Sequence, residues 1–111
     1  MLDLRFINKI RETGGKESLT GLVNLYLTDQ ELIFRQIRTA LAERDPPRLQ
    51  DRAHALRGCS IGLGAVAVGA LCRDIELVSA AGNWVEVANL VLKLEIEALS
   101  VDSELRFEIS K

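Results

Sequence analysis

The only histidine of the chain, His54, has neighbours that suit it to chemistry on an anion. If this segment is helical, Arg57 and Gly58 are its next-turn neighbours, because residues three and four apart share a helix face. A neutral imidazole is a nucleophile, and a guanidinium holds anionic oxygens through charge-assisted hydrogen bonds. Gly58 leaves space for a second molecule to approach. The spacing suits phosphoryl transfer, which asks a protein mainly for positioning and charge stabilisation.

A helical wheel predicts that His54 faces solvent. The amphipathic stripe of this segment consists of Leu49, Ala53, Leu56, Ser60 and Leu63. At about 100° per residue, His54 points about 140° away from that stripe. This position argues against a core histidine whose hydrogen bonds are satisfied inside the protein.

Other candidate sites in the sequence are weaker. Residues 62–67 imitate the glycine fingerprint of dinucleotide-binding proteins, but that motif works only between a strand and a helix. Neither Cys59 nor Ser60 has a base within reach, because His54 lies on another face. Cys59 and Cys72 have no further cysteine or histidine at ligand spacing, so we expect neither a disulfide framework nor a zinc site.

The composition argues against several classes of protein. The formal net charge is −2 over 111 residues, so we expect no basic field for nucleic acid. We find no signal-peptide core and no segment apolar enough to span a bilayer. We therefore expect one cytoplasmic domain over residues 1–111, free-standing or part of a larger protein, without a metal, a cofactor or a membrane contact.

The periodicity of apolar residues predicts an all-α fold. A short amphipathic helix is predicted over residues 2–12, ended by Gly14 and Gly15. Longer helices are predicted over residues 16–44, from Pro46 or Pro47 to about 62, over 65–80 and over 84–109. Short connections between long helices favour antiparallel neighbours. The expected architecture is an antiparallel up-and-down four-helix bundle with a short additional N-terminal helix.

The motif around His54 resembles the signature of histidine-containing phosphotransfer (HPt) domains. That signature reads alanine-histidine-x-leucine-lysine-glycine with a further glycine six residues on, and the matching residues are Ala53, His54, Leu56, Arg57, Gly58 and Gly64. The likeness continues through Ile75 and Glu76 and extends over most of the chain. The sequence departs from the family pattern at two positions. Arg57 replaces the usual lysine, and Gly62 stands where the family often has asparagine.

The resemblance implies that His54 accepts a phosphoryl group from the aspartate of a response-regulator receiver domain and passes it on. Arg57 stabilises the phosphoryl group in this interpretation, and Gly58 admits the partner, which brings its own magnesium. The expected docking rim consists of Gln50, Asp51 and Ile61. Tyr26 and Phe34 either extend this rim or pack in the core. We expect a monomeric phosphoryl carrier, not an independent catalyst, with receiver domains or hybrid histidine kinases as partners.

Three other interpretations stay open at this point. The first is a helical interaction module of the HPt fold that binds signalling partners without transferring phosphate. The second is an enzyme that uses Cys59 or Cys72 as its nucleophile. The third is a simple dimerising bundle.

Overall fold

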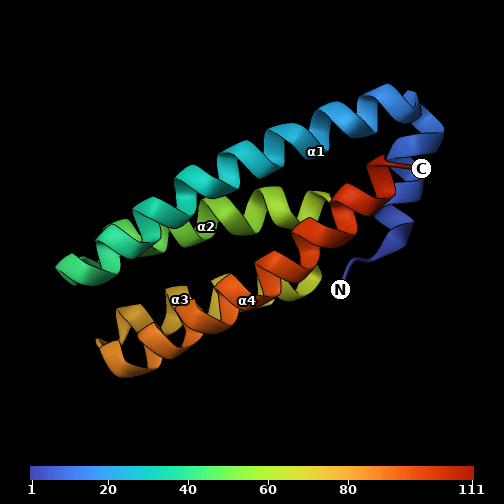
Figure 1. Ribbon diagram of the computed structural model, residues 1–111. Coiled ribbons are helices and arrows are strands. Elements are labelled where there is room, and N and C mark those ends of the chain that lie inside the picture. The colour runs from blue at the N-terminus through green and yellow to red at the C-terminus, as the bar shows by residue number, and fades with distance from the viewer.

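The computed structural model describes residues 1–111 as four α-helices, and no strand is present. The helices are α1 (Leu4–Glu43), α2 (Pro46–Gly62), α3 (Val66–Ala80) and α4 (Trp84–Ile109). Short turns reverse the chain between them, so successive helices run antiparallel (Figure 1). Helix α1 packs on α2 and α4, and α3 packs on the same two helices, whereas α2 and α4 lie diagonally across the bundle. The predicted up-and-down four-helix bundle is confirmed.

The boundary between α1 and α2 falls at the two prolines, as predicted. Arg44 adopts the left-handed conformation with a φ of 52°, and its N–H satisfies carbonyl groups of the last turn of α1. The side chain of Asp45 then caps α2 by accepting a hydrogen bond of 3.2 Å from the backbone N–H of Arg48. Pro46 follows at the first helical position, where a missing N–H leaves no partner unsatisfied.

Helix α1 contains a kink at Gly15, whose φ of 78° and ψ of 177° are not helical. The additional N-terminal helix expected from the sequence is the segment of α1 before this kink. In Figure 1 this dark blue segment turns away from the long part of α1 and lies at the end of the bundle where α4 ends. The Leu2 N–H donates to Glu104 at 2.7 Å, and the Asp3 N–H donates to the Gly64 carbonyl at 2.8 Å. The N-terminal segment therefore closes this end of the bundle.

Gly64 lies in the turn between α2 and α3, and its position requires a glycine. Its φ is 82°, in the left-handed region. A Cβ atom there would lie 2.5 Å from the Asp3 carbonyl oxygen. The turn and the N-terminal segment can approach this closely only without a side chain.

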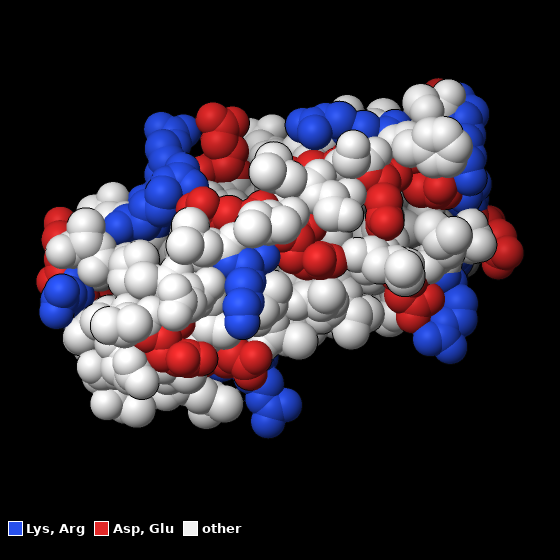
Figure 2. Space-filling view, turned by 60° about the horizontal axis from the view of Figure 1, so that its bottom comes forward, with Lys and Arg blue, Asp and Glu red and all other residues white.

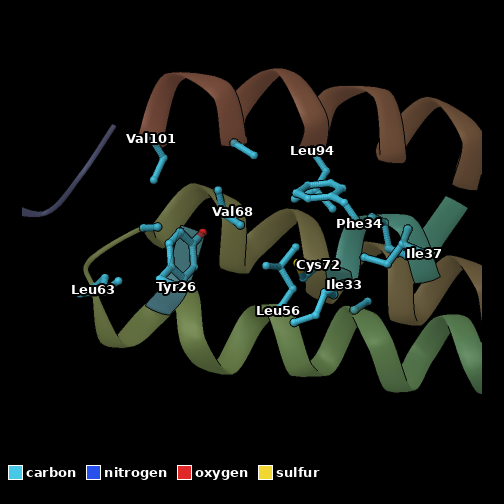
Figure 3. Packing of buried hydrophobic residues seen from close by; sticks show 14 of the residues in the cluster. Tyr26, Ile33, Phe34, Ile37, Leu56, Leu63, Val68, Cys72, Leu94 and Val101 are labelled. Atoms are coloured by element: carbon cyan, nitrogen blue, oxygen red, sulfur yellow. The ribbon is translucent and has the colours of Figure 1, made fainter. Parts of the chain in front are cut away.

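One hydrophobic cluster of 24 buried residues runs through the bundle. The core positions predicted on α2 and α4 are all buried: Leu49, Ala53, Leu56, Ser60 and Leu63, and Val87, Leu90, Val91, Leu94, Ala98, Val101 and Leu105. Figure 3 shows Tyr26 and Phe34 among these side chains, and only 3% and 7% of their surfaces are exposed. Both aromatic residues therefore belong to the core and not to the docking rim.

None of the four helices combines the length and the apolar character that crossing a bilayer requires.

Candidate functional site

His54 lies in the middle of α2 and faces solvent, as the helical wheel predicted. Its side chain is 66% exposed. Ala53 and Leu56, on either side of it in sequence, are fully buried. The apolar side of α2 therefore fixes the orientation of the helix, and the imidazole projects from the opposite side.

Two side chains of opposite charge lie beside Nδ1 of the imidazole. Nη2 of Arg57 is 3.4 Å from Nδ1, and Oε1 of Glu76 is also 3.4 Å from it. The other oxygen of Glu76, Oε2, is buried, accepts no hydrogen bond and lies 3.6 Å from Nη1 of Arg57. No hydrogen bond or ion pair involves Nε2. The protein side of the ring is thus occupied at Nδ1, while Nε2 is left for an external reactant.

Sequence reasoning did not assign a role to Glu76. This residue lies on α3, 22 positions after His54, and a wheel of α2 cannot show which α3 residue comes close. The signal that was available was the likeness to the family motif, which includes this glutamate. Its contacts with His54 and Arg57 appear only once α2 and α3 are packed together.

Two glycines shape the surroundings of the site. A Cβ atom on Gly58 would meet no other atom within 4 Å, so the surface beside the imidazole is open. A Cβ on Gly69 of α3 would lie 2.8 Å from Cγ1 of Ile61 and 3.6 Å from Cγ of Arg57. Gly69 therefore leaves room for the Ile61 side chain and lets α3 approach α2 closely.

The three predicted rim residues differ in their exposure. Gln50 is half-buried, whereas Asp51 and Ile61 are exposed. Asp51 pairs with Arg52 at 2.7 Å. Ile61 is 43% exposed and lies on the α2 surface next to α3.

An apolar groove runs between α1 and α2 beside Gly58. Leu22, Leu25 and Asp29 line it from α1, and Gly58 and Cys59 line it from α2. The two leucine residues are 44% and 58% exposed. Sequence reasoning did not include this groove in the site, because its two walls come from different helices.

The two cysteine residues are poor nucleophiles in this environment. Burial raises the pKa of the Cys59 thiol, and it raises the pKa of Cys72 to about 12. Little thiolate is present at neutral pH under these conditions. Cys59 donates a hydrogen bond to the Ala55 carbonyl and has no histidine partner. No three His, Cys, Asp or Glu side chains gather in a way that could hold a metal ion.

Comparison with known proteins agrees with this geometry. The family model of the Hpt domain matches residues 21–102. Among solved structures, the histidine-containing phosphotransfer protein B (HptB) of Pseudomonas aeruginosa PAO1 superposes with a TM-score of 0.91 and 26% sequence identity. That match covers 98% of this chain and 94% of the other. A sequence comparison with curated proteins gave no match.

The fold and the exposed imidazole together define a helical bundle of the phosphotransfer class. The chain belongs to the Hpt domain family, and its role is histidine phosphotransfer within a phosphorelay.

Proposed function

We propose that His54 is the phosphoryl acceptor and that its Nε2 attacks the acyl phosphate of a receiver-domain aspartate. The lone pair of Nε2 forms the new N–P bond, and the electron pair of the broken P–O bond leaves with the aspartate carboxylate. The proton on Nδ1 stays on the ring, where the Glu76 carboxylate, 3.4 Å away, faces the positive charge that the ring acquires. Transfer to a second receiver reverses these steps. The observation that carries this proposal is the exposed imidazole whose Nε2 has no partner.

In this mechanism Arg57 stabilises the phosphoryl oxygens. An Nδ1 that carries the proton cannot accept from the guanidinium, so the contact of 3.4 Å between Nη2 and Nδ1 gives way. The side chain of Arg57 is 31% exposed and stays paired with Glu76 at 3.6 Å, which keeps it near the reacting group. Its N–H groups then donate to the phosphate, as guanidinium groups commonly do.

We propose that the receiver docks on the exposed face of α2 and on the groove between α1 and α2. Gln50, Asp51 and Ile61 form the rim on α2, and Leu22 and Leu25 supply apolar contacts from α1. We expect a transient signalling interface, which buries less than about 1,200 Å² in total. The receiver, or a hybrid histidine kinase that contains one, supplies the magnesium. His54, Arg57 and Glu76 come from one copy of the chain, so a monomer suffices for transfer.

We place this activity in the cytoplasm. Cys59 and Cys72 are both free thiols, which supports a reducing compartment because disulfides are rare there.

Replacing His54 by glutamine is expected to abolish phosphoryl acceptance. The variant and the native chain are each mixed with a phosphorylated receiver of the parent organism, and the label on the domain is measured. The native chain should gain label that is labile in acid and stable in base. His54→Gln should gain none and should keep its melting temperature, because the side chain is 66% exposed. Label on the variant contradicts the assigned site, and binding without any transfer to the native chain favours the non-transferring module.

Replacing Leu25 by glutamate is expected to weaken receiver docking by about tenfold or more, since a charge in an apolar contact costs at least about 1.4 kcal/mol. The matched control is Ile96→Glu on α4, at a position 69% exposed against 58% for Leu25. Titration calorimetry with the receiver measures both affinities. Equal affinities for the two variants contradict docking at the groove between α1 and α2.

A further inference from the structure

Helix α4 carries a second apolar face that no other part of the chain covers. Its members are Val85, Leu92, Ile96, Leu99 and Phe107, which are 60% to 76% exposed. At about 100° per residue they lie within about 40° of one direction, on the side opposite the buried stripe of the same helix. Within about 60° of that direction Arg106 is the only charged residue of α4. A helix that is apolar on both sides is normally covered on both.

We propose that this outer face of α4 packs against the same face of a second copy of the chain, as an antiparallel pair centred on Ile96. This departs from the monomer expected from the sequence and is independent of phosphoryl transfer. The two ends of the face are placed symmetrically about Ile96, because Val85 and Phe107 lie eleven residues before and after it, about 16 Å each way. A two-fold axis at Ile96 therefore sets Phe107 of one copy against Val85 of the other.

The surface around Val85 offers a hollow for that phenyl ring. A groove of about 690 Å³ opens there, lined by Leu41 from α1, by Arg44 just after α1, and by Trp84, Val85 and Ala88 from α4. At the opposite end the Phe107 side chain is 63% exposed, and Nζ of Lys111 lies 5.2 Å from the centre of its ring. An exposed ring and a hollow at equal distances from one centre suit a self-complementary, two-fold interface.

The charges that border this face favour a second copy over a strongly charged partner. Glu95 is already paired with Arg38 at 3.1 Å, and the Glu104 carboxylate accepts from the Leu2 N–H. In Figure 2 basic and acidic groups are interspersed with uncharged side chains over the face in view. Two carboxylates beside the face are therefore already engaged within the chain.

The apolar area is of the right order for a dimer. Each of the five side chains exposes roughly 100 Å² of apolar surface, so together they present on the order of 500 Å². In a standard interface each partner buries about 800 Å². The groove around Val85 adds to this area when Phe107 of the other copy enters it. Since α2 and α4 lie on the diagonal of the bundle, both copies of His54 stay free for receivers.

Sedimentation equilibrium at chain concentrations from about 10 μM to about 1 mM tests for a dimer whose dissociation constant lies in this range. The apparent mass of the native chain should rise from 12.3 kDa towards twice that value. Ile96→Glu should stay monomeric and keep native helicity and phosphoryl acceptance, whereas Leu25→Glu should dimerise like the native chain. A native chain that stays at the monomer mass at the highest concentration overturns the proposal and leaves the face to a different protein.

Cysteine cross-linking tests the register of the pair in a Cys59→Ser background. Ile96→Cys should form a disulfide with itself, because the two-fold axis brings the two thiols together. Val85→Cys should link to Phe107→Cys when the two variants are mixed and oxidised, and each should give little product alone. Self-linking of Val85→Cys overturns the antiparallel arrangement.

Discussion

Nδ1 of His54 has two neighbours that favour different states of the ring. The guanidinium of Arg57 can only donate, which suits an Nδ1 without a proton, whereas the carboxylate of Glu76 accepts from a protonated Nδ1. Attack by Nε2 needs its lone pair free, so the neutral ring must carry its proton on Nδ1. Glu76 is therefore the neighbour that supports the reactive tautomer, and Arg57 is the one that must turn towards the phosphoryl group.

Replacing Glu76 by glutamine should slow phosphoryl transfer by about tenfold, because a hydrogen bond to a charged group contributes about 1.5 kcal/mol and each 1.4 kcal/mol is tenfold in rate. The amide still accepts a hydrogen bond but cannot offset the charge on the ring, and Glu76→Ala should be slower again. Rapid-quench experiments measure the rate of phosphoryl transfer, and titration calorimetry measures the affinity for the receiver. Together they distinguish an effect on the position of His54 from an effect on docking. Glu76→Gln should leave the affinity unchanged, and a native rate would show that Glu76 does not act on His54.

At the scale of the helix, Gly15 lets α1 turn over the end of the bundle. The conformation with φ of 78° and ψ of 177° is open almost only to glycine, and no other atom lies within 4 Å of where a Cβ would be. The cost of a side chain at this position is therefore a backbone cost alone. Gly21, six residues on, lies inside the helix with equally open space around it.

Gly15→Ala should lower the free energy of unfolding by about 1–3 kcal/mol, the usual cost of such strain. Gly21→Ala should raise it by about 0.5–1 kcal/mol, because alanine favours a helix interior. The midpoints of urea unfolding give both values, and the pair differs only in backbone conformation. Two changes of the same sign would contradict the kink at Gly15.

On the scale of the whole molecule, a buried polar chain ties three helices together. The Tyr26 hydroxyl and Ser60 Oγ are 3.0 Å apart, and Gln30 Nε2 donates to Tyr26 at 3.1 Å and to Asp102 Oδ1 at 2.8 Å. These residues belong to α1, α2 and α4. Burial raises the pKa of Tyr26 to about 12, and burial likewise raises the pKa of Asp102. Such a chain fixes how the helices are aligned along their axes.

Asp102→Asn should stabilise the protein at pH 7. The raised pKa means that the folded state holds the Asp102 proton more tightly than the unfolded state does, so this residue makes the native chain less stable as the pH rises from below its unfolded pKa. Asparagine keeps the acceptor for Gln30 without a charge. Thermal unfolding should show a higher melting temperature for the variant at pH 7 and a smaller difference near about pH 2.5, where Asp102 is protonated in both the folded and the unfolded state. A difference that grows towards acid would contradict this account.

Much of the molecule follows from the sequence because the helical repeat is a local property. The spacing of apolar residues placed His54 on the exposed side of α2, and it identified the buried residues of α4. The cap at Asp45 and the prolines after it likewise marked a helix boundary, since capping involves only neighbouring residues.

Only the tertiary structure decided what lies across from each face. Tyr26 and Phe34 proved to be core residues, Glu76 came to His54 from another helix, and the groove beside Gly58 formed from two helices. The alignment of helices along their axes depends on the packing of all side chains at once, including the close approach at Gly69. A periodic sequence determines which face of a helix is buried, but not which residues of its neighbour that face meets.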